Sequence, residues 1–416
     1  MSFDLFADLS AHLHSAQFLD SARHPEHPMA FLRQRKLPLP SLVATMLCGM
    51  RKSVQSELDE FFGHLRGGAE LVRHVSEQAF AKARAKLAAN ALPGLNDWLL
   101  ARTEQGGLIP RWNGLRLVAA DATTVRFGHR ASHVPRAAPT DQIAFGLYLP
   151  QAELMLAASL HSTHEHERQM LFEHLDRLAP TDLLLMDRGY PCRWLAACLV
   201  QRGIPFCMRA EKAGTSSFAC VREFLRSGLA ECVVQLRAPD RADARDYECE
   251  AEPVTVRLIR HVASTGKIRV LMTNLLDVQR FPPELFGDLY HQRWRIEEAF
   301  KRLKHRLNLE HVTGLSQLTA IQDLAAKVVC DNLHALVAAQ AHTAAALPDE
   351  RRINRTYAMT AIRPHLPKLL LGKILAEQWA GLLDLLSRRT HVHRPGRSNP
   401  RPKQAKPHKF MTQKAS

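Results

Sequence analysis

An alternation of apolar strand-like and amphipathic helix-like segments between residues 115 and 210 constrains the fold of this chain more than any other feature. Three strands are predicted first, and a helix, a strand, a helix and a strand follow. The strands are predicted at 115–127, 143–150, 153–161, 181–190 and 204–210, and the helices at 166–178 and 192–203. This order predicts an α/β fold, in which a mixed sheet is flanked by helices.

A helical N-terminal domain is predicted for residues 1–105, where apolar residues recur at helical spacing. Ser76 stands where the last helix of this region would be capped. Lys82, Arg84 and Lys86 fall on the predicted exposed face of that helix. Such a domain suits docking on DNA, although a solvated helical bundle would show the same pattern.

Residues 106–335 are predicted to form a catalytic domain. Residues 336–388 are predicted to form a helical C-terminal region suited to dimerisation. Residues 211–280 read as a β-rich insertion, within which the polar stretch 239–248 is predicted to be an exposed loop. The tail 389–416 is rich in proline, lysine and arginine and has no acidic residue. It is predicted to be disordered and to contact nucleic acid non-specifically.

A single helix is predicted for residues 284–307, and its polar face is unusual. On a helical wheel, Tyr290, Arg293, Glu297 and Lys304 fall in a stripe about 60° wide, beside an apolar stripe. An ordinary surface helix with local ion pairs is the alternative. That alternative does not explain why a carboxylate lies between a tyrosine, an arginine and a lysine next to the core.

Two aspartates are the expected partners of Glu297. Asp121 follows an apolar run and Asp187 ends another, although an aspartate at a strand end is by itself usually a turn or cap residue. Carboxylates on neighbouring strands can converge, and their mutual repulsion is relieved by divalent cations. Oxygen-only ligands suit Mg²⁺ or Mn²⁺. Two such ions about 3.5–4 Å apart can activate a water or a 3′-hydroxyl and stabilise the leaving oxygen.

The spacing Tyr-x2-Arg-x3-Glu-x6-Lys that begins at Tyr290 resembles the Tyr-Arg-Glu-Lys (YREK) signature of DDE insertion-sequence transposases. It is similar in particular to that of the insertion sequence four group. The sequences DATTV around Asp121 and MDRGY around Asp187 resemble the first and second acidic motifs of the same family. The resemblance covers about residues 21–386 and is weakest at its N-terminal end and in residues 211–265.

The resemblance implies a ribonuclease-H-like, integrase-like catalytic core with a β-rich insertion between the second aspartate and the glutamate. It implies that Asp121, Asp187 and Glu297 bind two Mg²⁺ or Mn²⁺ ions. Relatives commonly excise their element through a hairpinned DNA end and join its 3′ ends to target DNA, as a dimer acting on two ends. The implied partners are therefore duplex DNA with terminal inverted repeats, target DNA and a second copy of the chain.

Four side chains are implied to contact DNA near the transposon end. Tyr290, Arg293 and Lys304 belong to the signature, and Arg188 follows the second aspartate directly. Composition is consistent with such a partner, because 56 lysines and arginines against 41 acidic residues give a net charge of +15, which suits a polyanion.

The cysteines, the apolar segments and a histidine cluster indicate the compartment and a candidate second metal site. The eight cysteines form no C-x-x-C pair and read as reduced thiols, and no signal peptide is evident, so a bacterial cytoplasmic protein that associates with the nucleoid is expected. The apolar region 325–347 is broken by charged residues and reads as an amphipathic helix rather than a membrane span. His161, His164 and His166 could bind zinc, but a polar strand-to-helix junction fits their spacing better.

The sequence leaves two functions open besides that of an active transposase. One is a catalytically inactive protein that binds DNA ends or acts as an inhibitor. The other is a nuclease that needs no particular terminal sequence, which the Tyr-Arg-Glu-Lys signature makes a weaker reading.

Overall fold

The structure is a computed structural model that describes residues 2–33, 35–128, 134–212, 214–263 and 266–392. The chain divides into two compact units, each assembled from separate stretches of sequence. The first unit contains Met1–Gly106, Val125–Asp141 and Lys301–Ser416, and the second contains Gly107–Thr124 and Gln142–Phe300. The tail predicted to be disordered over 389–416 is ordered at its start, where Thr390–Val392 form a strand, and beyond residue 392 it lies outside the described residues.

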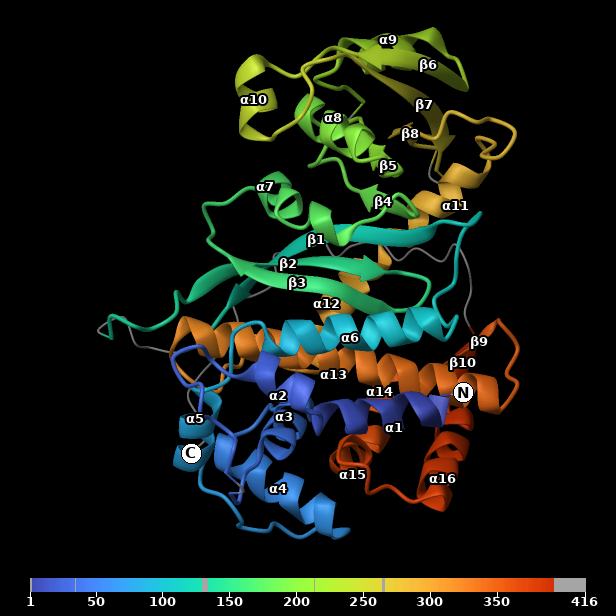
Figure 1. The fold of residues 1–416 in the computed structure, drawn as a ribbon. Helices are drawn as coiled ribbons and strands as arrows, with labels where there is room; N and C mark the ends of the chain where they lie inside the picture. The colour runs from blue at the N-terminus through green and yellow to red at the C-terminus, as the bar shows by residue number, and fades with distance from the viewer. Residues whose placement is uncertain (1, 34, 129–133, 213, 264–265, 393–416) are drawn as a thin grey trace. The chain divides into compact units, whose positions relative to one another are not determined.

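The framework of the second unit is an eight-stranded sheet with the strand order β3-β2-β1-β4-β5-β8-β7-β6 (Figure 1). β4 pairs in parallel with both β1 and β5, whereas β2–β3, β5–β8, β7–β8 and β6–β7 are antiparallel. The strands are β1 (Arg116–Arg126), β2 (Asp141–Leu149), β3 (Leu154–His161), β4 (Asp182–Met186), β5 (Phe206–Arg209), β6 (Glu231–Leu236), β7 (Val254–Val262) and β8 (Ile268–Thr273). The predicted mixed α/β architecture is confirmed.

The central strand of this sheet is also its most apolar. Every residue of β4 is buried, and the run Leu183–Met186 has no exposed surface. A continuous apolar run is typical of a parallel strand that is covered on both faces. Burial of this strand fixes the level at which the following residue, Asp187, leaves the sheet.

The β-rich segment 211–280 extends the main sheet, because β8 pairs with β5. The segment also contains two helices that were not predicted, α9 (Ala219–Ser227) and α10 (Arg241–Asp246). The prediction of an exposed loop at 239–248 is therefore wrong over α10. Tyr247, at the end of α10, stacks on Trp194 with ring centroids 3.6 Å apart, and this aromatic contact orders a segment whose composition is typical of a loop.

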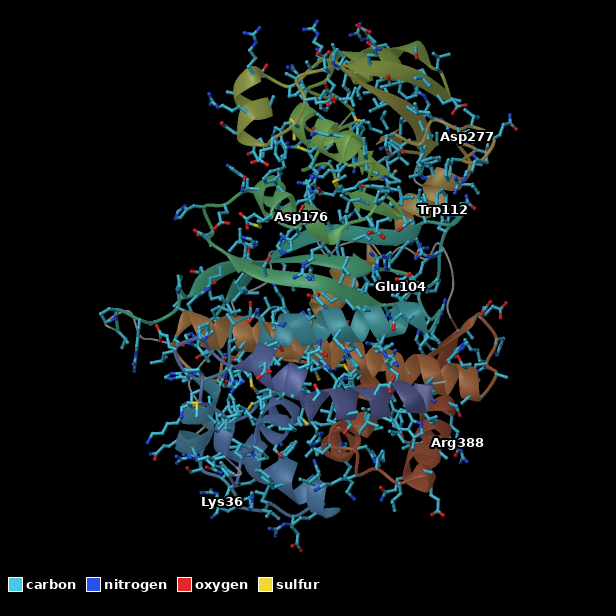
Figure 2. All side chains as sticks on the ribbon, viewed as in Figure 1. Lys36, Glu104, Trp112, Asp176, Asp277 and Arg388 are labelled. Atoms are coloured by element: carbon cyan, nitrogen blue, oxygen red, sulfur yellow. The ribbon has the colours of Figure 1, made fainter. Side chains whose placement is uncertain are left out.

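Four other helices accompany the sheet: α7 (Glu167–Phe172), α8 (Arg193–Gln201), α11 (Leu285–Gln292) and α12 (Arg295–His305). α8 and α11 contact β7, and α9 contacts β6 (Figure 1). At the start of β1, Trp112 stacks on Phe281 just before α11, with ring centroids 5.7 Å apart; Trp112 is labelled in Figure 2. This contact ties the segment leading into α11 to the strand that carries Asp121.

The first unit is helical, as predicted for the two ends of the chain. Its helices are α1 (Ser2–Leu13), α2 (Ala16–Ala22), α3 (Leu39–Leu47), α4 (Val54–Arg66), α5 (Glu77–Arg84), α6 (Ala91–Gln105), α13 (Gln317–Ala344), α14 (Arg355–Ile362), α15 (Leu366–Leu370) and α16 (Ala376–Ser387). A short hairpin pairs β9 (Arg351–Ile353) with β10 (Thr390–Val392). The predicted cap of α5 is confirmed, since the Ser76 hydroxyl accepts a hydrogen bond from the Ala79 backbone N–H.

The long helix α13 is the centre of this unit, where it packs against α3, α6, α14 and α16. Its charged residues do not form an exposed stripe, so the prediction of an amphipathic helix is wrong. Lys327 donates to two backbone carbonyls, and Asp331 accepts from Arg302 and Arg355. These partners allow α13 to be buried around its circumference from Gln322 to Ala338. Among the described residues, no helix is both long and apolar enough to span a bilayer.

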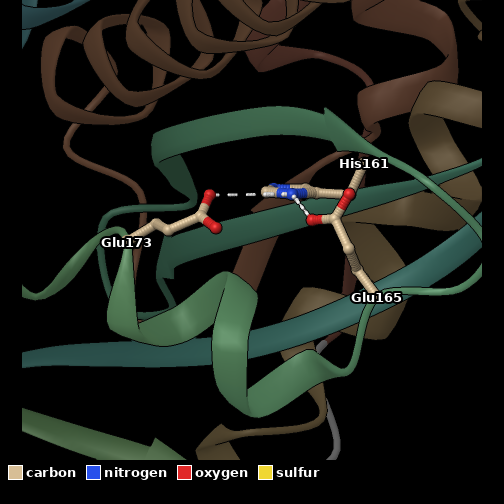
Figure 3. Close-up of side chains that lie close together, drawn as sticks. All are labelled: His161, Glu165 and Glu173. Carbon is tan, nitrogen blue, oxygen red and sulfur yellow. Dashed lines mark hydrogen bonds and ion pairs between the residues drawn. The ribbon is translucent and has the colours of Figure 1, made fainter. Parts of the chain in front are cut away.

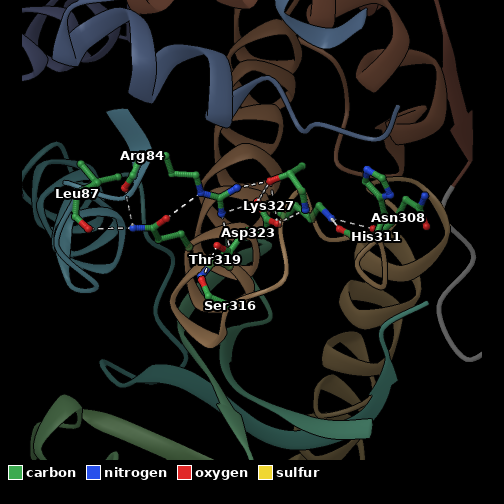
Figure 4. A network of polar contacts seen from close by, with 10 residues as sticks. Arg84, Leu87, Asn308, His311, Ser316, Thr319, Asp323 and Lys327 are labelled. Carbon is green, nitrogen blue, oxygen red and sulfur yellow. Dashed lines mark hydrogen bonds and ion pairs between the residues drawn. The ribbon is translucent and has the colours of Figure 1, made fainter. Parts of the chain in front are cut away.

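Arg84 is buried, which contradicts the prediction that it lies on an exposed basic face with Lys82 and Lys86. Its guanidinium forms an ion pair with Asp323 at 2.8 Å and donates to the Gln322 side chain (Figure 4). The same group donates to the Thr319 carbonyl and to the Thr313 hydroxyl. Because its charge and hydrogen-bonding groups are matched, the arginine is stable at only 4% exposure.

The buried side chain of His334 should make the free energy of unfolding sensitive to acid. Burial lowers the pKa of His334 to about 4, from an ordinary value of 6.5. Between pH 6.5 and pH 4, the unfolded chain therefore binds a proton at His334 that the folded protein does not bind. The free energy of unfolding falls as the pH drops through this range. The expected loss is about 3 kcal/mol at full extent. Denaturant unfolding at pH 7 and pH 4.5 should show this loss in the wild type and a smaller one in His334→Leu; equal losses would contradict it.

Candidate active site

Asp121 and Asp187 lie side by side on adjacent parallel strands. β1 and β4 pair with Ala119 opposite Leu185, and each aspartate lies two residues beyond its member of that pair. Because side chains alternate between the two faces of a sheet, the two carboxylates leave the sheet at the same level and on the same face. The strand register therefore brings the two aspartates to neighbouring positions on the sheet. β1 continues to Arg126, so Asp121 lies within the strand and not after it.

Glu297 is supplied by α12, which is a separate helix from the one that carries Tyr290. The backbone N–H groups of Arg293 and Trp294 bond to carbonyls three residues earlier instead of four. This tight turn separates α11, which ends at Gln292, from α12, which starts at Arg295. The prediction of one helix over 284–307 is wrong, and a single wheel does not place the four signature residues on one stripe.

Two contacts fix α12 against β2 and the β2–β3 turn. The Arg295 guanidinium donates to the Pro150 carbonyl at 3.1 Å and lies 3.5 Å from the Glu153 carboxylate. On β2, Gly146 provides space for Phe300, because a Cβ at this glycine would lie 3.1 Å from the ring. Close packing of helix on strand therefore holds Glu297 at a defined position.

Arg293 connects the first and third carboxylates. Its guanidinium donates to Glu297 at 2.9 Å and lies 3.9 Å from Asp121. Only 5% of Arg293 is exposed, and its Nε has no hydrogen-bond partner among the described residues. Tyr290 is also buried, and burial raises its pKa to about 12. In this structure the immediate partners of Arg293 are therefore the site carboxylates.

The other two residues expected to contact DNA, Arg188 and Lys304, are less buried than Tyr290 and Arg293. Arg188 is exposed directly beside Asp187. Lys304 is partly exposed and follows Glu297 by seven residues on α12, which is about two helical turns.

A fourth carboxylate, Glu167, lies in the same site and was missed by sequence reasoning. It is the first residue of α7, and a Cβ built on Gly189 would lie 3.0 Å from an Asp187 oxygen and 3.6 Å from a Glu167 oxygen. Burial, and next the Asp187 carboxylate, raise the pKa of Glu167. No sequence motif marks this residue, and the histidines that precede it indicate a different chemistry.

The electrostatics of the site favour cation binding. The pKa of Asp121 is raised to about 7, mainly by burial; the Arg293 guanidinium opposes this shift, and the carboxylates of Glu297 and Glu167 contribute to it. Tyr190 is fully buried and its hydroxyl has no hydrogen-bond partner among the described residues. Burial raises the pKa of this phenol, as do the carboxylates of Glu167, Asp121 and Asp187, so it lies in their field.

Of the three histidines in residues 161–166, only His161 lies between carboxylates. His161 bonds to Glu165 at 2.8 Å and lies 3.8 Å from Glu173, and the donor atoms of all three lie within 4.8 Å (Figure 3). Its other ring nitrogen contacts the Ser159 hydroxyl at 2.6 Å. His164 and His166 are exposed and take no part in this group. With both ring nitrogens engaged, His161 fits the polar strand-to-helix junction.

Comparison with known families identifies the class of this chain. Residues 112–333, more than half of the chain, match the family described as Transposase DDE domain. The chain belongs to this family. The matched residues include Asp121, Asp187 and Glu297.

Two similar proteins can be named. One is the Escherichia coli (strain K12) protein "Transposase InsG for insertion sequence element IS4", 25% identical over 299 residues. The match spans 68% of this chain and 65% of that protein, which is less than two thirds of its length. The other is the piggyBac transposase in a synaptic complex with hairpin DNA, a cryo-EM structure with 12% identity and a TM-score of 0.41, covering 92% of this chain and 84% of that one.

Proposed function

We propose that this chain is a DNA transposase of the insertion sequence four group that cleaves strands at transposon ends and transfers them into target DNA, by cut-and-paste transposition. The observation that carries the proposal is the site itself. Asp121 and Asp187 share one level of two parallel strands, and Arg293 links Asp121 to Glu297 on α12. Membership of the DDE transposase family supports the same reading.

The proposed core is ribonuclease-H-like and spans residues 106–335, with the insertion 211–280 between the second aspartate and the glutamate. Support comes from a mixed sheet whose parallel strands β1 and β4 carry the two aspartates. We assign DNA-end binding to residues 1–105 and dimerisation to residues 336–388. The net charge of +15 supports a DNA partner, and we place the protein in the bacterial cytoplasm.

The proposed cofactors are two Mg²⁺ or Mn²⁺ ions, held by Asp121, Asp187 and Glu297. These residues fit such ions because the donors are all oxygen, which hard cations prefer. Gly189 leaves free the space that a Cβ would fill between carboxylate oxygens. Bound cations would supply Lewis-acid stabilisation of the attacking and leaving oxygens in an in-line displacement.

The protein's own groups have separate roles in this mechanism. Asp121, with its pKa of about 7, is partly protonated in the cation-free protein and must give up that proton to act as a ligand. Arg293 holds Glu297 in place through their hydrogen bond. Tyr290, Arg293, Lys304 and Arg188 are proposed to position and neutralise DNA phosphates, which would require Arg293 to exchange carboxylate partners for phosphate.

Lys304→Ala is expected to weaken DNA-end binding and to make the remaining affinity less dependent on salt. Loss of one phosphate contact removes about 0.9 from the slope of log K against log salt. Electrophoretic mobility shifts or fluorescence anisotropy at several salt concentrations would measure it. Lys373→Ala removes the same charge from an exposed position outside the signature and serves as the control. Equal slopes for the two variants would refute a phosphate contact at Lys304.

The function is tested on DNA taken from either side of the protein's own reading frame. Strand cleavage is compared with Mg²⁺, with Mn²⁺ and with chelator. Metal-dependent nicking at one fixed position supports the transposase. Tight binding to the ends without cleavage would select the inactive end-binding protein, and cleavage that ignores the terminal sequence would select a general nuclease.

A further inference from the structure

The carboxylates of the site fall into two pairs with different connections. Asp121 and Glu297 are linked through the Arg293 guanidinium. Asp187 and Glu167 have no such bridge among their described contacts, and both place an oxygen around the position that a Gly189 Cβ would occupy. Among the described residues no ion pair neutralises either member of this second pair, although the Arg293 guanidinium lowers the pKa of Glu167 against the effects of burial and of Asp187.

The loop between β4 and α8 is built to keep this second pair in place. The Gly189 backbone N–H donates to Asp187 at 2.7 Å. On α7, Arg168 follows Glu167 directly and donates to the carbonyls of Gly189 and Pro191. Helix α7 and the loop after β4 are thus hydrogen-bonded to each other, which fixes Glu167 relative to Asp187.

Tyr190 brings a buried polar group into the field of this pair. Its side chain is fully buried, and its hydroxyl has no hydrogen-bond partner among the described residues. Buried hydroxyls are almost always satisfied by protein or by ordered water. The phenol lies in the field of Glu167, Asp121 and Asp187, so a hydrated cation between these carboxylates would bring a water to the hydroxyl.

We infer that Glu167 is a fourth carboxylate ligand, which shares one divalent cation with Asp187. The inference rests on the proposed function, since it assumes that the three family carboxylates bind cations. When no cationic side chain bridges two adjacent carboxylates, a hard metal cation relieves their mutual repulsion most strongly.

The test is calorimetric titration of the full chain with Mn²⁺ alone, without DNA. Wild type is expected to bind two ions, and Glu167→Gln is expected to lose one ion or to bind it at least about 10-fold more weakly, as is typical of metal-site substitutions. Glu173→Gln, at the other end of α7, is the matched control and is expected to bind both ions. It also removes a member of the His161 group, so it separates binding there from binding at Glu167.

Thermal melting separates ligand loss from misfolding. In chelator, Glu167→Gln is expected to melt at or above the wild-type temperature, because the substitution removes repulsion from Asp187. Mn²⁺ should then stabilise wild type more than the variant. A lower melting temperature in chelator combined with unchanged stabilisation by Mn²⁺ would overturn the inference.

The titration also distinguishes two kinds of failure. If Glu167→Gln still binds two ions while Asp187→Asn and Glu297→Gln lose them, Glu167 is not a ligand and the proposed function stands. If wild type binds no Mn²⁺, or Asp187→Asn binds it normally, the metal site of the proposed function fails and the role of Glu167 fails with it.

Discussion

Glu297→Gln is expected to lower the rate of strand cleavage by about 10³-fold, a loss typical of removing an essential electrostatic group. DNA-end binding should remain close to wild type. The glutamine keeps an oxygen that can accept the hydrogen bond from Arg293, so local structure is preserved while the negative charge for the cation is lost. Single-turnover cleavage and end binding, measured on the same preparation, separate the two effects.

Glu298→Gln is the matched control for this substitution. Glu298 is the next residue on α12 and is exposed, and the change removes the same charge. Cleavage by this variant should be near the wild-type rate. If Glu297→Gln cleaves normally, the assignment of the active site is wrong.

Arg84→Met is expected to destabilise the helical unit by about 3–5 kcal/mol, because it leaves the buried carboxylate of Asp323 without its partner. The Gln322 side chain and the Thr319 carbonyl lose bonds as well. Denaturant unfolding measures the change. Lys82→Met, on the exposed face of the same helix, should change stability by less than about 0.5 kcal/mol.

A double variant tests the physical reason. In Arg84→Met combined with Asp323→Leu, both members of the ion pair are removed, so stability should recover in part relative to Arg84→Met alone. A double variant that is as unstable as the sum of the two single variants would show that the ion pair is not the cause.

Sequence patterns predicted the parts of the fold that depend on local periodicity. The apolar run ending in Asp187 is a buried parallel strand, and Asp121 lies on its neighbour. Both assignments follow from the length and composition of the strands. Ser76 caps α5 because the capping bond involves residues only three positions apart.

The sequence did not predict features that arise from contacts between distant segments. Arg84 is buried because Asp323 lies 239 positions away in the chain and reaches it in the fold. Glu167 joins the site because the loop after β4 returns to α7. The break between α11 and α12 is a matter of backbone hydrogen bonds, which residue type does not reveal.

Strand transfer distinguishes a transposase from a nuclease, because a nuclease cuts DNA without joining the free 3′ end to a target. A duplex with a pre-cleaved element end and a free 3′-hydroxyl is incubated with wild type, Mg²⁺ or Mn²⁺ and a supercoiled target plasmid. We expect plasmid joined covalently to the labelled 3′ end, with no product in chelator or with Glu297→Gln. Nicked plasmid without joined label, at any metal concentration, would contradict it.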